Sequence, residues 1–323
     1  MSAPDFRPAV WLPGPHAQTL GARLLRSRAA GPTLRRERVE LPDGDFLDLD
    51  ATGGNPDAAL ALVLHGLEGS ATSGYARQVY RSLAARGIES LGLNFRSCSG
   101  ALNRTPRLYH SGETSDLRFV LELVRRRFPR RPLGAVGFSL GGNILLKYLG
   151  EEGAAAPLAA AAAISVPFDL AAGARRLERG FSRGYRRYLV GKLKRKTLAK
   201  AALLDGRVDL GRVRRSRTFQ EFDDAATAPL HGFADAQDYY ARSSSNQYLA
   251  SIRVPTLLIH ALDDPFLPPE AVPREVVAAN PVLTGAFTRH GGHVGFVTGP
   301  PWAPVFWAEG WAADFLAGYI APT

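Results

Sequence analysis

The chain contains several short, nearly unbroken runs of apolar residues, which are separated by segments with the amphipathic spacing of helices. Such apolar runs are typical of strands in a parallel sheet that is covered on both faces. Their alternation with helices predicts an α/β fold with a mostly parallel, doubly wound sheet. The expected strands are 60–65, 90–95, 133–138, 160–166 and 256–260, and the expected helices are 75–86, 113–128, 140–149 and 301–320.

Two segments depart from this alternation. Residues 35–50 have the pattern of an antiparallel hairpin, with a Pro-Asp-Gly turn at 42–44, because these residues favour tight turns. Residues 169–250 have the pattern of helices and loops, without an apolar strand. Since this stretch precedes the last expected strand, we expect it to form a helical cap insertion over the strand ends. The predicted α/β core then consists of residues 1–168 and 251–323.

The composition is that of a globular protein with a large core. Hydrophobic residues make up 46% of the 323 residues, which argues against a disordered chain. The single cysteine, Cys98, excludes an internal disulfide framework and cysteine-rich metal sites, and it fits a reducing compartment. Residues 1–8 lack the layout of a secretory signal, and the longest apolar run, 154–166, is too short to span a bilayer.

Positive charge is concentrated in one segment. The formal net charge is +10, and residues 175–217 alone contain sixteen Lys or Arg and three Asp or Glu. Such a block is typical of a solvated helix face, or of a surface that contacts anionic lipid or nucleic acid. The only interleaved aromatic residues are Phe181, Tyr185 and Tyr188, and no nucleic-acid-binding motif is present, so we expect no nucleic-acid partner. A solvated surface and weak peripheral contact with an anionic membrane both stay open.

The most informative motif is Gly-Phe-Ser-Leu-Gly at residues 137–141. It joins the expected strand 133–138 to the expected helix 140–149. A G-x-S-x-G motif between a strand and a helix is typical of the nucleophile elbow of α/β-hydrolases, which exposes the serine hydroxyl above the sheet. An ordinary glycine-rich turn can have the same pattern, so the assignment depends on partners further along the chain. We predict that Ser139 is the nucleophile.

A serine nucleophile needs a histidine as general base and a carboxylate that orients the histidine. In α/β-hydrolases the three follow in the order Ser, Asp or Glu, His. Asp263 and Asp264 follow the last expected strand, where catalytic groups of parallel sheets gather. We favour Asp264 over Asp263 because its spacing to Pro268 matches the common pattern of this fold.

The predicted general base is His293. It stands in a glycine-rich loop after another short strand, and we favour it over His290 because it closes a Gly-Gly-His unit. Both histidines could instead be metal ligands, but the sequence offers no third or fourth ligand near them. We therefore expect neither a metal nor any other cofactor.

A tetrahedral intermediate also needs an oxyanion hole. We expect its donors to be the backbone N–H groups of Leu140, directly after the nucleophile, and of Leu67, in the loop that begins at His65. Gly66 allows close approach of the backbone to the substrate, and we place Gly66 and Phe138 in the substrate-binding site. His65 itself has the position of a structural histidine at a strand end.

Motifs from one end of the chain to the other are those of a known family. They are 15–19 (PHAQT), 41–46 (LPDGDF), 65–70 (HGLEGS), 94–100 (NFRSCSG), 109–114 (YHSGET), 137–143 (GFSLGGN), 222–224 (FDD), 238–240 (DYY), 263–266 (DDPF) and 291–296 (GGHVGF). On these motifs the chain resembles the YheT-type α/β-hydrolases, whose animal relatives belong to the ABHD group. One departure is Ser97, where the family usually has glycine; it touches no predicted triad residue.

The resemblance implies a serine esterase or lipase that cleaves carboxylic esters of short-chain, medium-chain or lipid acids. Members of the family with a membrane anchor carry an N-terminal spanning segment, which is not seen in this sequence, so the resemblance implies a cytoplasmic enzyme. Two alternatives stay open: an acyltransferase that uses the same triad, and a non-catalytic binding protein of the same fold. The oligomeric state is left undetermined.

Overall fold

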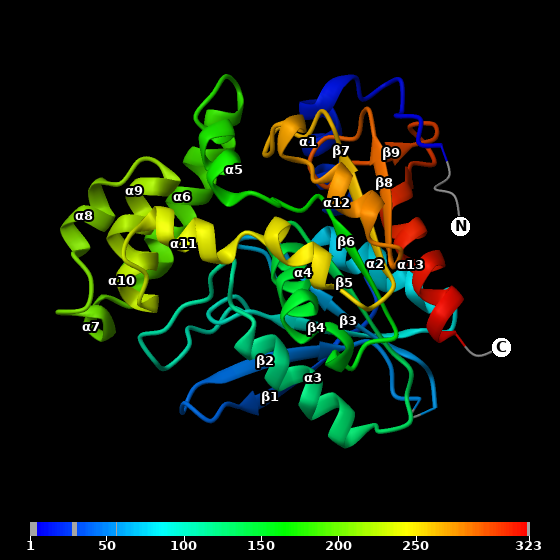
Figure 1. The fold of residues 1–323 in the computed structure, drawn as a ribbon, viewed down its shortest axis with the longest axis horizontal. Helices are drawn as coiled ribbons and strands as arrows, with labels where there is room; N and C mark the ends of the chain where they lie inside the picture. Colours follow the sequence, from blue (N-terminus) through cyan, green and yellow to red (C-terminus); the bar gives the residue numbers. More distant parts are fainter. Residues whose placement is uncertain (1–4, 28–30, 56, 322–323) are drawn as a thin grey trace.

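The computed structural model describes residues 5–27, 31–55 and 57–321. Its central feature is an eight-stranded sheet with the order β1-β2-β4-β3-β5-β6-β7-β8 (Figure 1). Strands β3 to β8 are parallel, whereas β1 and β2 form an antiparallel edge. The strands are β1 Arg35–Glu40, β2 Phe46–Ala51, β3 Leu60–Leu64, β4 Glu89–Asn94, β5 Leu133–Phe138, β6 Ala160–Ile164, β7 Thr256–Ala261 and β8 Leu283–Thr288.

Helices cover both faces of the sheet because strand side chains alternate between the two faces. In β3, Leu62 and Leu64 pack with residues of α3 and α4, whereas Ala61 and Val63 pack with residues of α2 and α13. The helices are α1 Gly14–Ser27, α2 Gly74–Ala84, α3 Ser115–Arg127, α4 Leu140–Glu152, α5 Leu170–Leu177, α6 Ser182–Ala199, α7 Ala201–Leu204, α8 Leu210–Arg215, α9 Phe219–Phe222, α10 Ala228–His231, α11 Ala236–Ser243, α12 Arg274–Ala279 and α13 Trp307–Ile320. This arrangement confirms the predicted doubly wound α/β-hydrolase fold.

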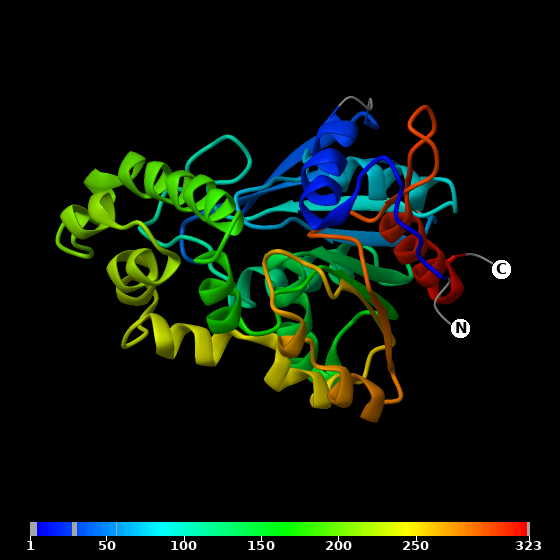
Figure 2. The same ribbon diagram turned by 90° about the horizontal axis from the view of Figure 1, so that it is seen from above.

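A helical insertion, defined here as residues 165–255, connects β6 to β7. It contains α5 to α11, the π-helix η2 (Asp223–Thr227) and the 3₁₀ helix η3 (Ser245–Ser251), and Figures 1 and 2 show most of it as a separate group of helices at one end of the molecule. Its last part returns to the core, where Asn143 of α4 donates to the carbonyl of Ser243 and accepts from the amide of Ser245. The division of the chain into a core and a cap with bounds at residues 169 and 250 stays a prediction.

The C-terminal helix begins later than predicted. The expected helix covered 301–320, but α13 begins at Trp307, because Val305–Phe306 (β10) instead pair with Val297–Thr298 (β9). Pro304 precedes this short strand and disfavours helical backbone before it. A helix that the sequence did not predict, α1, lies near the N-terminus.

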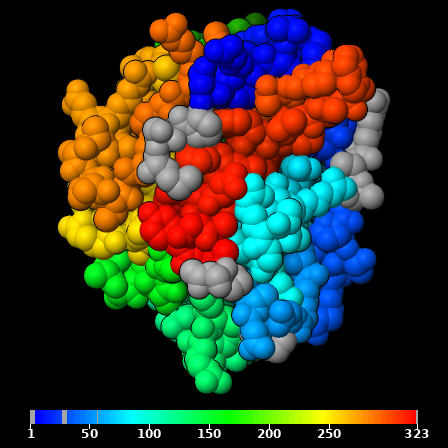
Figure 3. Space-filling view, turned by 90° about the vertical axis from the view of Figure 1, so that its right-hand side faces the viewer, coloured from blue at the N-terminus to red at the C-terminus, as the bar shows by residue number. Residues whose placement is uncertain are grey.

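The N-terminal segment packs against the C-terminal part of the chain. Figure 3 shows the face on which blue N-terminal residues lie beside orange and red C-terminal ones. The ring of Phe6 lies 5.6 Å from that of Phe296 and 5.3 Å from that of Trp307. Within the described ranges, no helix has both the length and the apolar character needed to cross a bilayer.

Candidate active site

Ser139 lies at the sharp turn between β5 and α4. Its backbone has φ +51° and ψ −119°, a conformation that costs a non-glycine residue about 1–3 kcal/mol. The glycines of the motif serve close packing: a Cβ atom at Gly137 would lie 2.6 Å from the Cα of Gly142, and one at Gly141 would lie 2.5 Å from the carbonyl oxygen of His65. The strain is therefore on the serine itself, and the glycines let the helix approach the strand ends.

The structure brings Ser139, His293 and Asp264 into one hydrogen-bonded row. His293 Nε2 lies 3.0 Å from Ser139 Oγ, and its Nδ1 lies 2.8 Å from Asp264 Oδ2. The ring of Phe266 stacks on the imidazole, with 3.9 Å between ring centroids. The carboxylate fixes which nitrogen carries the proton, and the stacked ring fixes the plane of the imidazole.

Asp264 is fully buried at the end of β7. Burial raises the pKa of Asp264, but the charge and hydrogen bond of His293, together with the amide of Phe266 at 2.7 Å, outweigh it and leave that pKa below its usual value. Asp264 is therefore ionised at neutral pH. Burial lowers the pKa of the neighbouring His260 to about 4, so that histidine adds no positive charge there.

Asp263 has a different environment. One of its carboxylate oxygens accepts from the amide of Gly292 at 2.9 Å, and the other lies 3.3 Å from Nδ1 of the exposed His290. These contacts shape the loop that leads to His293. The structure thus places Asp264, rather than Asp263, against the imidazole of His293.

The other predicted site residues lie around Ser139 and differ in how they approach it. A Cβ atom at Gly66 would lie 3.2 Å from the Cβ of Ser139, so the loop after β3 passes directly against the nucleophile. Leu67 and Leu140 line the same cavity as Ser139. Phe138 lines the adjoining cavity together with Gly66 and Ser139, and its ring is buried among residues of the α2 face.

A salt bridge holds the loop that contains Leu67. Glu68 has a φ of +55°, and its amide donates to the hydroxyl of Tyr109 at 2.8 Å. Its carboxylate accepts from the same hydroxyl at 2.8 Å and from Lys196 Nζ at 2.6 Å, while Lys192 Nζ donates to its backbone carbonyl at 2.7 Å. Both lysines belong to α6, so the helical insertion helps to position the predicted oxyanion loop.

Helix α1 holds the loop that carries His293. The hydroxyl of Thr19 accepts from the amide of His293 at 2.9 Å and donates to the carbonyl of Pro15 at 2.7 Å. The side chain of Gln18 accepts from the amide of Val297 at 2.8 Å and donates to its carbonyl at 3.2 Å. These residues belong to the motif 15–19, one of those on which the family resemblance rests.

A buried arginine adds to this support. Arg26 of α1 donates to the carbonyls of Val294 at 2.6 Å and Gly295 at 3.0 Å, and it pairs with Glu309 of α13 at 2.6 Å. Val294 and Phe296 both have positive φ values, 51° and 49°. Since such backbone is strained in non-glycine residues, the contacts from α1 stabilise the loop in the conformation that directs His293 toward Ser139.

Comparisons with known proteins agree with this architecture. Residues 62–300 match the family model described as the alpha/beta hydrolase fold. The protein YheT of Escherichia coli (strain K12) is 42% identical over 325 aligned positions, which cover 99% of this chain and 95% of that protein. The chain belongs to the YheT-type α/β-hydrolases. This confirms the family resemblance that the motifs predicted.

More distant proteins share the fold or the family. A phospholipase of Mus musculus is 31% identical over 91% of this chain and 74% of its own length. Among solved structures, an esterase of Pyrococcus furiosus aligns with a TM-score of 0.60 over 99% of this chain and 98% of its own, at 17% identity. This structural likeness shows that the two proteins have the same fold.

In this YheT-type hydrolase, two cavities meet at Ser139 and His293. The first lies between the helical insertion and the sheet and is mainly apolar; its lining includes Leu108, Leu170, Leu177, Leu189, Leu193, Phe219, Phe222 and Leu230. The second lies beside α1 and the middle of α6 and is more polar; its lining includes Arg23, Ser70, Ser73, Tyr185, Tyr188 and Lys192. Ser139 is thus accessible from an apolar side and from a polar side.

Polar side chains close part of the apolar cavity. Asp223 of η2 accepts from the hydroxyls of Thr227 at 2.5 Å and Tyr240 at 2.7 Å, and burial raises the pKa of Asp223 to about 7. Burial also lowers the pKa of His110 to about 3 and that of His231 to about 4. At neutral pH this part of the cavity therefore has uncharged imidazoles beside a carboxyl group that is close to its midpoint.

Proposed function

We propose that this protein is a carboxylic ester hydrolase that works through an acyl-enzyme on Ser139. The observation that carries the proposal is the row Ser139, His293 and Asp264, with 3.0 Å and 2.8 Å between the hydrogen-bonded atoms, at a strained turn between strand and helix. The esterase and phospholipase among the compared proteins support cleavage of esters.

Acylation begins when Ser139 Oγ attacks the carbonyl carbon of the ester while His293 Nε2 accepts the hydroxyl proton. Asp264 remains ionised and stabilises the imidazolium. The amides of Leu67 and Leu140 donate to the oxygen that becomes negative in the tetrahedral intermediate. The intermediate collapses when the bond to the leaving alkoxide breaks, and His293 gives that oxygen its proton.

Deacylation repeats these steps with water. His293 accepts a proton from the water molecule, whose oxygen attacks the acyl carbonyl, and then returns that proton to Ser139 Oγ as the bond to the acyl group breaks. The products are a carboxylic acid, an alcohol and the free enzyme. No cofactor takes part in this sequence of steps.

We assign the acyl chain to the apolar cavity and the alcohol part to the second, more polar cavity. An apolar acyl site favours esters of medium-chain or lipid acids. Apolar cavities distinguish chain lengths by only about 1–3 kcal/mol per methylene, so we expect a broad preference rather than a single substrate. The alcohol side, which contains cationic residues, accommodates polar alcohols better than apolar ones.

The test is a panel of p-nitrophenyl esters, from acetyl to palmitoyl, together with labelling by a fluorophosphonate probe. We expect hydrolysis and labelling in the natural protein, and neither in the Ser139→Ala variant. Failure of the folded protein to hydrolyse any ester or to be labelled would favour a binding protein of this fold. Formation of a new ester from an added alcohol would assign acyl transfer instead.

A further inference from the structure

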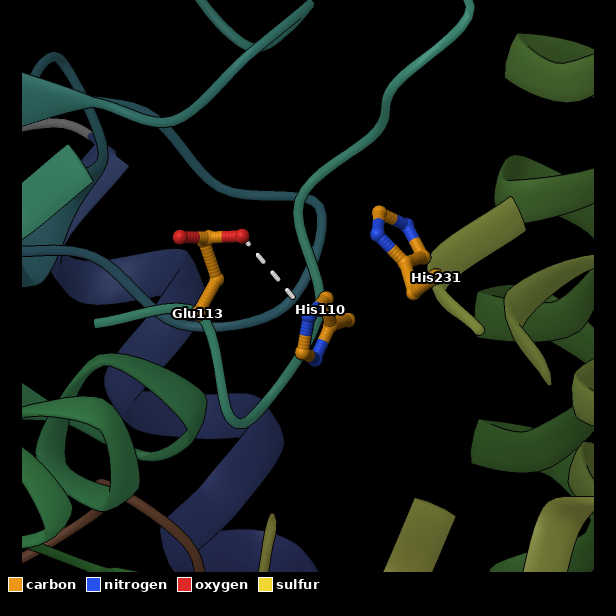
Figure 4. Close-up of side chains that lie close together, drawn as sticks. All are labelled: His110, Glu113 and His231. Atoms are coloured by element: carbon orange, nitrogen blue, oxygen red, sulfur yellow. Dashed lines mark ion pairs between the residues drawn. The ribbon is translucent and has the colours of Figure 1, made fainter. Parts of the chain in front are cut away.

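A second group of chemically capable side chains lies outside the triad. His110 and Glu113 belong to the loop before α3, and His231 is the last residue of α10 in the helical insertion (Figure 4). One ligand atom from each residue lies within 4.8 Å of those of the other two. Two imidazoles and a carboxylate form a common set of protein ligands for zinc, with a further position left for water.

The contacts around these residues set the protonation that a metal ion would have to change. The amide of Gly112 donates to His110 Nδ1 at 3.2 Å, so the neutral ring carries its proton on Nε2, which faces Glu113 Oε2 at 3.7 Å. A metal ion at Nε2 replaces that proton, and Nδ1 then carries the ring proton and loses its contact with Gly112. The other oxygen of Glu113 accepts from the amide of Ser115 at 2.9 Å. Contacts of this kind orient metal ligands and set their affinity.

One neighbouring cation opposes metal binding. The guanidinium of Arg107 pairs with Glu113 Oε2, the same oxygen that faces His110. Arg107 is 36% exposed, and Asp43 offers it a second carboxylate at 3.8 Å. It can therefore turn toward Asp43 and release the oxygen, and its competition should weaken the site.

We propose that His110, Glu113 and His231 form a binding site for a divalent transition-metal ion of the zinc type, with Arg107 as a competing cation. The two histidines favour such ions over magnesium and calcium, which prefer oxygen ligands. His110, Glu113 and His231 also line a cavity that is open to the surface, which gives an ion a route from solvent. A bound ion joins α10 to the core loop at the wall of the apolar cavity.

The site is tested by calorimetric titration of the full chain with Zn²⁺ near neutral pH. We expect one site whose affinity falls at least about tenfold in His231→Ala, because one ligand is lost. Affinity should rise in Arg107→Gln, because the competing cation is removed; a misfolded variant would not bind more tightly. His290→Ala, which removes an exposed histidine far from the cluster in sequence, is the matched control and should bind as the natural protein does.

Binding is measured without substrate, so the result does not depend on the proposed ester hydrolysis. Unchanged affinity in His231→Ala, or an equal loss in His290→Ala, would overturn the proposal. An affinity in Arg107→Gln that is equal to or weaker than that of the natural protein would overturn the role given to Arg107. Thermal unfolding with and without Zn²⁺ provides a second readout, since a ligand that binds the folded state raises the midpoint.

Discussion

His293 is held by contacts from two separate parts of the chain, the loop after β7 and helix α1. Asp264 accepts a hydrogen bond from its Nδ1, Phe266 stacks on its ring, and the hydroxyl of Thr19 accepts from its backbone amide. Each contact constrains a different freedom of the residue: the tautomer, the plane of the ring, and the place of the backbone. At the scale of single residues, the site therefore depends on a few side chains whose removal should affect kcat more than folding.

The nucleophile gives the largest expected effect. Ser139→Ala should lower kcat for an activated ester by at least about 10³, because the acyl-enzyme cannot form. Thermal unfolding should change little, since only one hydroxyl group is removed. The measurement is steady-state hydrolysis of a p-nitrophenyl ester, and more than a tenth of the natural activity in the variant would rule out the triad.

The two adjacent carboxylates provide a matched pair of variants. Asp264→Asn should lower kcat by about 10² to 10⁴, because the amide stabilises neither the required tautomer nor the imidazolium. Asp263→Asn should cost far less, because Asp263 contacts Gly292 and His290 instead. Both variants are compared under the same conditions, and the reverse order of effects would move the orienting role to Asp263.

Asp223 should make stability depend on pH. Its pKa is raised from 3.8 to about 7, so the folded state binds a proton more tightly than the unfolded state does. Stability from this group is therefore present at low pH and is lost as pH rises from about 4 to about 7. The variant Asp223→Asn lacks this ionisation. We therefore expect its free energy of unfolding, relative to that of the natural protein, to be higher above this pH range than below it.

Urea unfolding on either side of that pH range measures the difference for Asp223. The exposed Asp205, changed to Asn in the same way, controls for the change of side-chain type. A gain for Asp223→Asn that is the same at both pH values would show that its ionisation is not linked to folding.

At the scale of elements, two helices outside the sheet support the catalytic loops. Helix α1 holds the backbone of the histidine loop through Gln18, Thr19 and Arg26. Helix α6 of the insertion holds the loop after β3 through Lys192 and Lys196. The strands bring the predicted catalytic side chains to one edge of the sheet, and these two helices fix the loops that carry His293 and Leu67.

Thr19 tests the contribution of α1. Thr19→Val keeps the shape of the side chain but leaves the amide of His293 without its acceptor, an arrangement that costs about 1–3 kcal/mol when buried. We expect kcat to fall roughly tenfold with a smaller change in KM, because the imidazole is misplaced rather than the substrate. Thr19→Ser retains the hydroxyl and should restore most of the activity; equal losses in both variants would point to packing alone.

At the scale of the whole molecule, charge is distributed unevenly. Of the sixteen Lys and Arg in residues 175–217, ten are exposed. They are Arg175, Arg179, Arg183, Arg187, Arg195, Arg207, Arg212, Arg214, Arg215 and Arg217. Lys196 and Lys200, in contrast, point inward to partners in the core. The exposed cations lie on the helical insertion, which also covers the apolar cavity.

We expect weak, salt-sensitive binding of the protein to vesicles that contain phosphatidylglycerol. Each Lys or Arg near such a surface contributes about 1 kcal/mol, and the attraction fades beyond about 8 Å at physiological salt. Co-sedimentation at low and high salt measures the effect, with neutral vesicles as control. Equal binding to both vesicle types, or none at low salt, would leave the charge as a solvated surface.

The sequence by itself determined the parallel strands β3 to β7, the helices α2, α3, α4 and α13, and the order of the residues predicted to react. Buried parallel strands are continuous apolar runs, so β3 and β5 are visible in the local pattern. The turn at Ser139 also has a local motif, because close packing at Gly137 and Gly141 excludes larger side chains. These features depend on residues that are adjacent or nearly adjacent in the chain, so the local sequence pattern predicts them.

Only the tertiary structure decided which distant residues meet. The hydroxyl of Thr19 accepts from an amide 274 positions away, and Lys196 reaches Glu68 across 128 positions. His231 joins His110 and Glu113 only because the insertion folds back over the core. Such contacts follow from the path of the whole chain. Motifs mark several of these residues, but no motif or periodicity shows which distant residue each of them meets.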